Sequence, residues 1–407
     1  MTTPARDRIE AALRAWDGYE RKRGATPVID YDCHPADPGE PTDPAGSAAS
    51  VPAASRVAVL AELTAVADEP DCRADARLRS RVDADVTYLR AMLGERLPLA
   101  DHVRRTQGCG VAGWNDDHVA EVGERAKAGL AGVGVDWDAR TLVELAHGEG
   151  LLRRQDAPDA IRQAAADLEP LVRAATGADA PYQLTIESAD VDAYWSYWLD
   201  GAGSAARLRL NRHRAEFSET QARVFALHEV LGHALQSASW YARWAAVDDG
   251  AVRLLSVHTD TQVLLEGLAQ VLPLFVIGDD PGAVARVRLA HYIQLVRAGL
   301  HLAVNDGVPV ADCVVWARAR VPFWSDEEIG DALTDRGVDP LLRSYLWAYP
   351  AGIDWFVALA DSGDAASRAA VLRAAYRGPL APADLAALWP AGPIIGGWSP
   401  SPGARPR

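Results

Sequence analysis

Apolar residues recur at helical spacing over most of the chain and alternate with polar residues in only two short stretches. The helical spacing predicts helices over 4–23, most of 56–177, 283–304, 310–320, 326–336 and 365–376. The alternating stretches, 182–186 and 207–211, predict half-buried strands. We therefore expect a mainly helical fold with a small antiparallel β-sheet.

Two segments carry the capping-box pattern of a helix start. Ser218 is followed by Gln221, which predicts a helix beginning near Glu219. Thr259 and Gln262 repeat the pattern in front of an apolar run.

Shifts in composition divide the chain. Pro, Ala, Gly, Asp and Ser dominate 34–55, which is typical of a linker. The strands begin after residue 180, so we expect an N-terminal helical region over 1–179 and a catalytic region over 180–391. The Gly, Pro and Ser content of 392–407 predicts a disordered tail.

Composition excludes several classes of protein. The 407 residues carry a net charge of −15, which disfavours a nucleic-acid partner. The longest apolar runs, such as 271–277, are far shorter than the ~20 residues of a membrane span, and the N-terminus lacks an apolar signal core. Four widely spaced cysteines disfavour disulfides and a cysteine zinc site, so we expect a cytoplasmic protein without membrane contacts.

The residues with the clearest chemical meaning are His228, Glu229 and His233, which lie in one apolar helix. Neutral imidazole is a preferred nitrogen ligand for Zn²⁺, and a neighbouring carboxylate can accept a proton from zinc-bound water. This is the chemistry of the HExxH helix of metalloproteases. Here the spacing is HExxxH.

This spacing has a geometric consequence. Positions i and i+5 lie about 140° apart around a regular α-helix, so His228 and His233 would not reach one ion. A single π-type insertion would bring them together, and Gly232 gives the backbone the freedom for it. Two alternatives stay open: an undistorted helix that pairs Glu229 with His233, and two histidines that bind no metal.

A third ligand is expected from the next helix. Glu266 lies inside an apolar run, where an unpaired ionised carboxylate would cost several kcal/mol. It is the best candidate to complete a zinc site whose fourth position holds water. The alternative is an ion pair with an arginine such as Arg253 or Arg297.

These motifs resemble known zinc peptidases. The two histidines with a downstream glutamate resemble the gluzincin arrangement. The HExxGH form of 228–233 resembles the dipeptidyl-peptidase III family, although the gap to the glutamate is much shorter here. HExxxH followed by Glu-Gly-Leu-Ala at 266–269 resembles the microtubule-associated tyrosine carboxypeptidases and their bacterial relatives. The resemblance extends over roughly 180–360 to a bacterial family of predicted zincins with HExxPGH and EGWA helices. This chain lacks that proline and one residue of the motif.

The resemblance implies a zincin-like metallopeptidase architecture. It implies His228, His233 and Glu266 as zinc ligands and Glu229 as general base. Tyr349, with Tyr345 behind it, is the candidate that stabilises the oxyanion.

We therefore expect a zinc-dependent hydrolase that cleaves a peptide or amide bond of a small substrate. A non-peptidase metalloenzyme of specialised metabolism and a metal-free binding protein with a decayed site are the alternatives. The strand at 207–211 is a candidate for binding an extended peptide by edge addition. Its Arg207 and Arg209 either hold a substrate carboxylate or are solvated, and solvation is favoured. The aromatic cluster at 194–198 forms either a pocket wall or core packing, and core packing is favoured.

Overall fold

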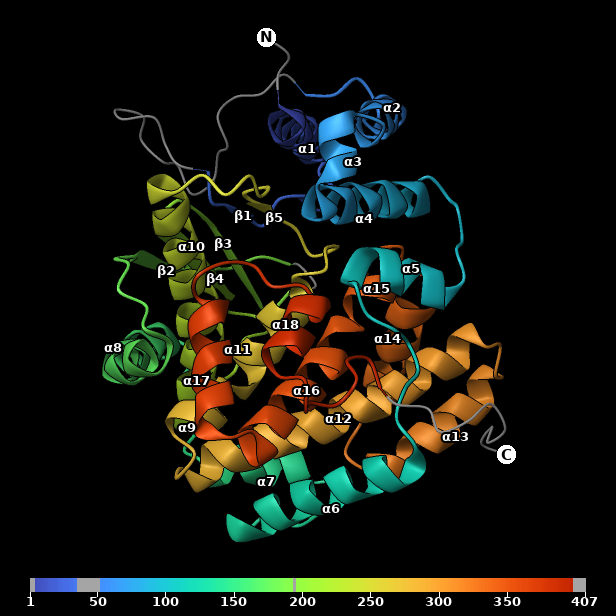
Figure 1. Cartoon of the computed structure of the whole chain (residues 1–407). Coiled ribbons are helices and arrows are strands. Elements are labelled where there is room, and N and C mark those ends of the chain that lie inside the picture. The colour runs from blue at the N-terminus through green and yellow to red at the C-terminus, as the bar shows by residue number, and fades with distance from the viewer. Residues whose placement is uncertain (1–3, 35–51, 193–194, 398–407) are drawn as a thin grey trace.

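The computed structural model describes residues 4–34, 52–192 and 195–397. The described residues form a mainly helical molecule with one five-stranded sheet (Figure 1). The N-terminal half holds α1 (Ala5–Lys22), α2 (Arg56–Ala67), α3 (Pro70–Ala74), α4 (Ala76–Met92), α5 (Leu99–Gln107), α6 (Asp116–Gly132), α7 (Thr141–Gly148) and α8 (Ala157–Thr176). The C-terminal half holds α9 (Glu219–Phe225), η1 (Ala226–Ala234), α10 (Leu235–Ala246), α11 (Gln262–Val276), α12 (Pro281–Asn305), α13 (Val310–Arg320), α14 (Asp326–Gly337), α15 (Leu342–Tyr345), α16 (Ala348–Ser362), α17 (Ala365–Ala375) and α18 (Pro382–Leu388).

Most helices lie where the apolar spacing predicts them. The predictions at 283–304, 310–320, 326–336 and 365–376 match α12, α13, α14 and α17 to within two residues at each end. The capping box of Ser218 and Gln221 is formed at the start of α9. The second capping box is wrong, because Thr261 is the N-cap of α11 and makes no side-chain cap bond.

The sheet is mixed, which corrects the expected antiparallel arrangement. Its strands are β1 (Tyr31–Asp32), β2 (Gln183–Ala189), β3 (Tyr197–Ala202), β4 (Ala205–Asn211) and β5 (Leu254–Leu255), in the order β2-β4-β3-β1-β5. Only β3–β4 and β1–β5 are antiparallel, whereas β2–β4 and β1–β3 are parallel. β3 and β4 form a tight hairpin, and β2 then pairs on the free side of β4, where its direction is parallel.

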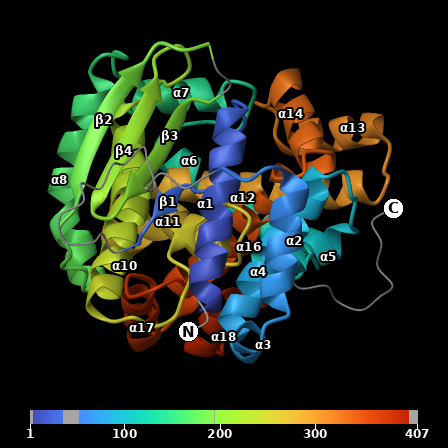
Figure 2. The same ribbon diagram turned by 90° about the horizontal axis from the view of Figure 1, so that it is seen from above.

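One face of the sheet joins the main core. Ala206, Leu208 and Leu210 alternate along β4 and are buried in the main core, where β4 contacts η1. Figure 2 shows α8 running along the flank of β2. Because β4 lies between β2 and β3, it has no free edge, so the expected addition of a peptide to this strand is wrong.

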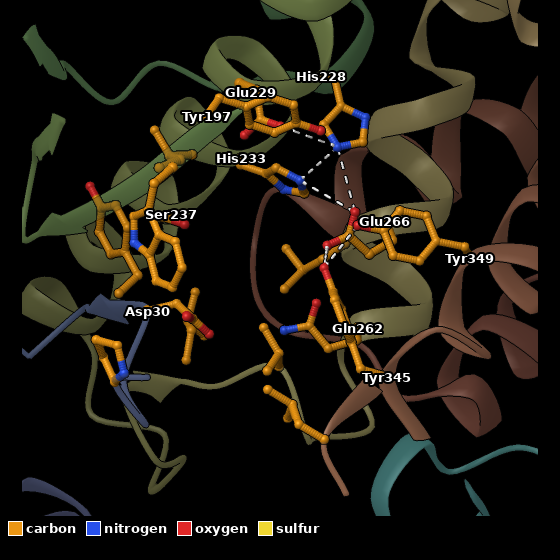
Figure 3. Close-up of a pocket in the computed structure, with 18 of the residues that line it drawn as sticks. Asp30, Tyr197, His228, Glu229, His233, Ser237, Gln262, Glu266, Tyr345 and Tyr349 are labelled. Carbon is orange, nitrogen blue, oxygen red and sulfur yellow. Dashed lines mark hydrogen bonds and ion pairs between the residues drawn. The ribbon is translucent and has the colours of Figure 1, made fainter. Parts of the chain in front are cut away.

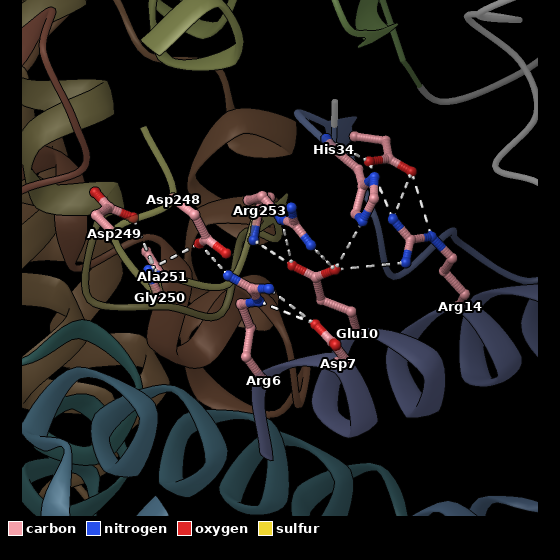
Figure 4. A network of polar contacts seen from close by, with 11 residues as sticks. Arg6, Asp7, Glu10, Arg14, His34, Asp248, Asp249, Gly250, Ala251 and Arg253 are labelled. Atoms are coloured by element: carbon pink, nitrogen blue, oxygen red, sulfur yellow. Dashed lines mark hydrogen bonds and ion pairs between the residues drawn. The ribbon is translucent and has the colours of Figure 1, made fainter. Parts of the chain in front are cut away.

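The N-terminal segment is bound into the same sheet. β1 pairs with β3 and β5, and α1 is attached to the strand region by a buried ion pair (Figure 4). The Glu10 carboxylate accepts hydrogen bonds from the Arg253 backbone N–H and guanidinium at 2.9–3.0 Å. Residues of the expected N-terminal and catalytic regions thus share one sheet.

Two helices at the centre of the molecule cross at very short range. A Cβ on Gly352 of α16 would lie 2.2 Å from the Val263 carbonyl oxygen and 2.8 Å from the Gly267 Cα of α11. The crossing therefore requires glycine at both positions, because neither backbone can move away from the other cheaply. It brings Glu266 on α11 close to the start of α16.

The segments expected to be irregular are described only in part. Of the linker at 34–55, residues 35–51 lie outside the described residues, and Ser55 caps α2. Of the tail at 392–407, residues 398–407 lie outside them. Gly396 accepts a hydrogen bond from the Gly113 N–H at 3.1 Å, which holds the preceding residues on the protein. Among the described helices, none combines the length and apolar character needed to cross a bilayer.

Candidate metal centre

The two histidines lie on a π-helical turn. Residues Ala226–Ala234 form η1, a π-helix between α9 and α10, and the Leu235 N–H bonds to the Val230 carbonyl five residues earlier. The turn brings the His228 and His233 Nε2 atoms to 3.2 Å from each other. The predicted π insertion is confirmed. The alternative of an undistorted helix that leaves His228 aside is wrong.

Glu266 reaches the same point from α11. Its Oε2 lies 3.5 Å from His228 Nε2 and 3.8 Å from His233 Nε2 (Figure 3). These separations are too long for good hydrogen bonds, and this buried oxygen has no hydrogen-bond partner in the described part of the chain. The structure thus brings together the three residues that the sequence predicted as ligands.

The spacing of the three atoms suits a tetrahedral ion. Ligand atoms about 2.0–2.2 Å from a tetrahedral ion lie about 3.3–3.6 Å from one another. The observed separations, 3.2, 3.5 and 3.8 Å, bracket that range. The donor set of two imidazoles and one carboxylate is also one that Zn²⁺ accepts. The residues present therefore fit the metal that the sequence predicted.

Electrostatics favours a charged Glu266. Burial alone would raise the pKa of Glu266, but the two imidazoles hold it well below its ordinary value. Neither arginine proposed as an ion-pair partner contacts this carboxylate. Arg253 pairs with Glu10, and the Arg297 guanidinium stacks over Trp324 with its carbon 5.5 Å from the ring centroid.

Glu229 lies beside the three converging atoms. Its Oε1 is 3.7 Å from His228 Nε2, and the residue is 4% exposed. Burial raises the pKa of Glu229 to about 7, and the Glu266 carboxylate adds to this against the effect of His228. A carboxylate whose pKa lies near neutrality is suited to accept and return a proton.

The two tyrosines considered for the oxyanion both lie beside Glu266. The Tyr345 hydroxyl, from α15, donates to Glu266 Oε1 at 2.6 Å, and the Tyr349 hydroxyl, from α16, is 2.8 Å from that of Tyr345. Burial and the Glu266 charge raise the pKa of Tyr345 well above its ordinary value, which keeps it a donor. Tyr345 thus donates a short hydrogen bond to the carboxylate, and Tyr349 lies next to both.

All these side chains line one cavity of about 270 Å³. Its wall is completed by residues from β1, β3, α10, α11 and the segments around them: Thr26, Pro27, Asp30, Tyr31, Tyr197, Trp198, Leu199, Ser237, Leu255, Val257, Gln262, Leu265, Leu341 and Leu342. The N-terminal members were missed from the sequence, because no local pattern connects 26–31 with the histidine helix.

The aromatic cluster at 194–198 belongs partly to this wall. Tyr197 and Trp198 line the cavity, and Tyr197 is 45% exposed, so core packing is the wrong interpretation for this pair. Tyr194 lies outside the described residues. Arg207 and Arg209 are neither substrate ligands in this cavity nor simply solvated. Both pair with Asp200 of β3, at 2.9 and 2.8 Å.

A second cluster of two histidines and a carboxylate lies outside the cavity. His118 of α6 and His291 of α12 each place Nε2 2.8 Å from Asp354 Oδ1 on α16, and Trp114 Nε1 donates to Oδ2 at 2.7 Å. This carboxylate is fully hydrogen-bonded, unlike that of Glu266. The cluster is therefore explained by hydrogen bonds alone, and its residues are too far apart in sequence to form a motif.

Comparisons with known proteins give a likeness of fold. No protein-family model and no curated protein matches the sequence. The crystal structure of a "putative lipoprotein" from Colwellia psychrerythraea is similar, with a TM-score of 0.52 and 12% sequence identity. The match covers 82% of this chain and 59% of that chain, so this chain spans about three fifths of its neighbour. At this identity the likeness shows the fold alone.

Proposed function

We propose that the protein is a zinc-dependent hydrolase that cleaves a peptide or amide bond of a small substrate. The observation that carries the proposal is the convergence of His228, His233 and Glu266 on one point, with a buried carboxylate oxygen that has no other partner in the described chain. A cavity of about 270 Å³ at that point accommodates a small molecule.

Each residue then has a defined task. His228, His233 and Glu266 would hold zinc, which when bound supplies a Lewis acid for the substrate carbonyl and for water. Glu229 takes the proton from the attacking water as the C–O bond forms. It returns that proton to the leaving nitrogen as the C–N bond breaks. The acyl product keeps the water oxygen, and the amine keeps the proton.

The remaining groups position a metal ligand and stabilise the charge that develops on the substrate. Tyr345 holds the Glu266 carboxylate through Oε1, so that Oε2 faces the imidazoles. Tyr349 has a hydroxyl at the cavity wall, and its proton, donated to Tyr345 in the free protein, would turn to the negative charge growing on the carbonyl oxygen. The wall also includes the apolar side chains of Leu199 and Leu265, which would contact an apolar part of the substrate.

The test compares metal content and turnover in matched variants. We expect about one zinc per chain in the wild type and in Glu229→Gln, and little in His233→Ala. Hydrolysis of a panel of short peptides should fall by roughly 10²–10⁴ in Glu229→Gln, because the proton acceptor is lost. His291→Asn is the control, since it removes a histidine of the hydrogen-bonded cluster and should keep the zinc.

The alternatives give different results. Zinc at full occupancy without hydrolysis of any peptide or amide would indicate another reaction on the same residues. Absence of zinc in the wild type after zinc loading would reject the metal site and favour a binding protein.

A further inference from the structure

One carboxylate in the cavity has no task in the proposed reaction. Asp30 precedes β1, and its backbone N–H donates to the Leu255 carbonyl at 3.0 Å, which fixes it to β5. Its side chain lines the cavity, across the open middle from His233 and Glu266 (Figure 3). Its Oδ2 is buried and has no hydrogen-bond partner among the described residues.

The cavity offers no positive side chain to neutralise this carboxylate. No lysine or arginine is among its described lining residues, while Asp30, Glu229 and Glu266 are three carboxylates. Arg21 is the cation that acts on Asp30, and its guanidinium is already bound to Asp17.

The buried carboxylate of Asp30 destabilises the protein when no ligand is bound. Burial raises the pKa of Asp30 to about 7, and the charges of Asp17 and Glu266 add to the effect, against a hydrogen bond from the Val257 backbone N–H. A cation that entered the cavity would restore the lost interactions of the carboxylate, because buried charges are stabilised when they are paired and hydrogen-bonded.

We propose that Asp30 is a specificity determinant that binds a protonated amine or guanidinium of the substrate. The inference rests on the proposed hydrolase function and names its substrate class. Tyr31, Tyr197 and Trp198 line the same cavity, and their rings suit the methylene groups and the charge of such a ligand. The cation is either the α-amino group of a short peptide or the side-chain group of a basic residue.

The test measures binding to zinc-loaded protein by calorimetry, without turnover. Hydroxamates anchor on zinc, so two pairs of them isolate the contribution of the cation. Leucine hydroxamate is compared with 4-methylpentanoyl hydroxamate, which lacks the α-amino group. The second pair is 6-aminohexanoyl hydroxamate and hexanoyl hydroxamate, which differ in a distal amine.

We expect the charged member of one pair to bind at least about tenfold more tightly than its neutral partner. A preference in the first pair assigns the α-amino group, and a preference in the second assigns a basic side chain. Asp30→Asn should reduce the preference to about twofold or less and leave the neutral hydroxamate unchanged. Asp32→Asn is the matched control, since it removes the same charge from a residue that pairs with Arg14 outside the cavity lining.

Two results would overturn the inference: no preference in either pair, or equal weakening of charged and neutral probes in Asp30→Asn. A thermal melt of Asp30→Asn separates a folding defect from a lost contact, and no loss of stability is expected from removing an unpaired charge. If no hydroxamate binds, the zinc function fails. The role of Asp30 is then decided by amides, which need no zinc and whose binding to the same variants is followed by NMR. Leucinamide is compared with 4-methylpentanamide, and 6-aminohexanamide with hexanamide.

Discussion

At the scale of the residue, Glu266 divides its two oxygens between two tasks. Oε1 accepts the hydrogen bond of Tyr345, and Oε2 faces the imidazoles without a hydrogen bond. Tyr349 lies beside the same carboxylate, and its hydroxyl is 2.8 Å from that of Tyr345. The two tyrosines stand four positions apart on adjoining helices but differ in their hydrogen bonds. Tyr345 donates to Glu266, and the Tyr349 hydroxyl is bonded to that of Tyr345.

This difference predicts opposite effects for two matched substitutions. Tyr345→Phe should weaken zinc binding by about 10–100-fold, because a metal ligand loses the group that orients it. Tyr349→Phe should leave zinc binding within about threefold and lower kcat by about 10²–10³, because a donor to the oxyanion is lost. Zinc affinity is measured by competition with a chelator, and kcat on the best peptide substrate. Equal loss of zinc in both variants would contradict the assignment.

Individual residues of the site were predictable where the signal is local. His228, Glu229 and His233 lie within six positions, and Glu266 is conspicuous as a carboxylate in an apolar helix. The placement of Tyr345 and Tyr349 beside Glu266 depends on how α15 and α16 meet α11, which no local pattern encodes. Asp30 depends on the pairing of β1 with β5, a contact between distant parts of the sequence.

At the scale of the element, the π-helix is the feature that brings the two histidines of the site together. Its extra residue lets HExxxH place both imidazoles on one side, and α11 packs directly against it. A Cβ on Gly232 would lie 2.8 Å from the Ala269 Cβ and 2.8 Å from the Leu227 carbonyl oxygen. Gly232 therefore sets the distance between the histidine helix and the helix that carries Glu266.

Gly232→Ala should consequently weaken both the fold and the site. We expect the free energy of unfolding to fall by about 1–3 kcal/mol, as in other overpacked interiors, and zinc binding to weaken as η1 moves from α11. Gly330→Ala in α14 is the control, since a Cβ there meets nothing within 4 Å; it should stabilise by about 0.5–1 kcal/mol. Urea unfolding and zinc titration measure both effects. Wild-type stability and zinc affinity in Gly232→Ala would refute the packing argument.

The spacing of apolar residues predicted where helices and strands lie better than it predicted which strands pair with one another. The 3.6-residue spacing located α12, α13, α14 and α17 because it reports which helix face is buried. Alternation located β2 and β4 for the same reason. It carries no information on which strand lies beside which, so the parallel pairing of β2 with β4 was missed.

At the scale of the whole molecule, the N-terminal segment is part of the cavity. The buried ion pair of Glu10 and Arg253 attaches α1 to the strand region. The pairing of β1 with the sheet then places Asp30 in the cavity wall opposite the histidines. Asp30 and the three residues proposed to bind zinc are thus far apart in the sequence and meet only in the folded chain.

Two buried histidines that do not line the cavity connect the stability of the whole fold to pH. His102 of α5 and His301 of α12 are buried, and their Nε2 atoms lie 3.2 Å from the Pro340 carbonyl oxygen and 2.9 Å from that of Arg343. Burial lowers the pKa of His102 to about 4. Burial also lowers the pKa of His301 well below its ordinary value, and the guanidinium of Arg336 adds to this effect. Both imidazoles are therefore neutral donors in the folded protein near neutral pH.

The sign of the pH dependence follows from proton uptake. Below about pH 6.5 the unfolded chain protonates these histidines and the folded chain does not, so each lowers the free energy of unfolding by up to about 1.4 kcal/mol per pH unit. The raised pKa values of Asp30 and Glu229 act in the opposite direction, so a variant must isolate the histidine term. His301→Gln keeps an N–H donor without a titrating ring. Its stability deficit relative to the wild type should shrink by about 2 kcal/mol between pH 8 and pH 5, measured by urea unfolding at both values. A deficit that stays constant over this range would show that His301 is not held neutral by the fold.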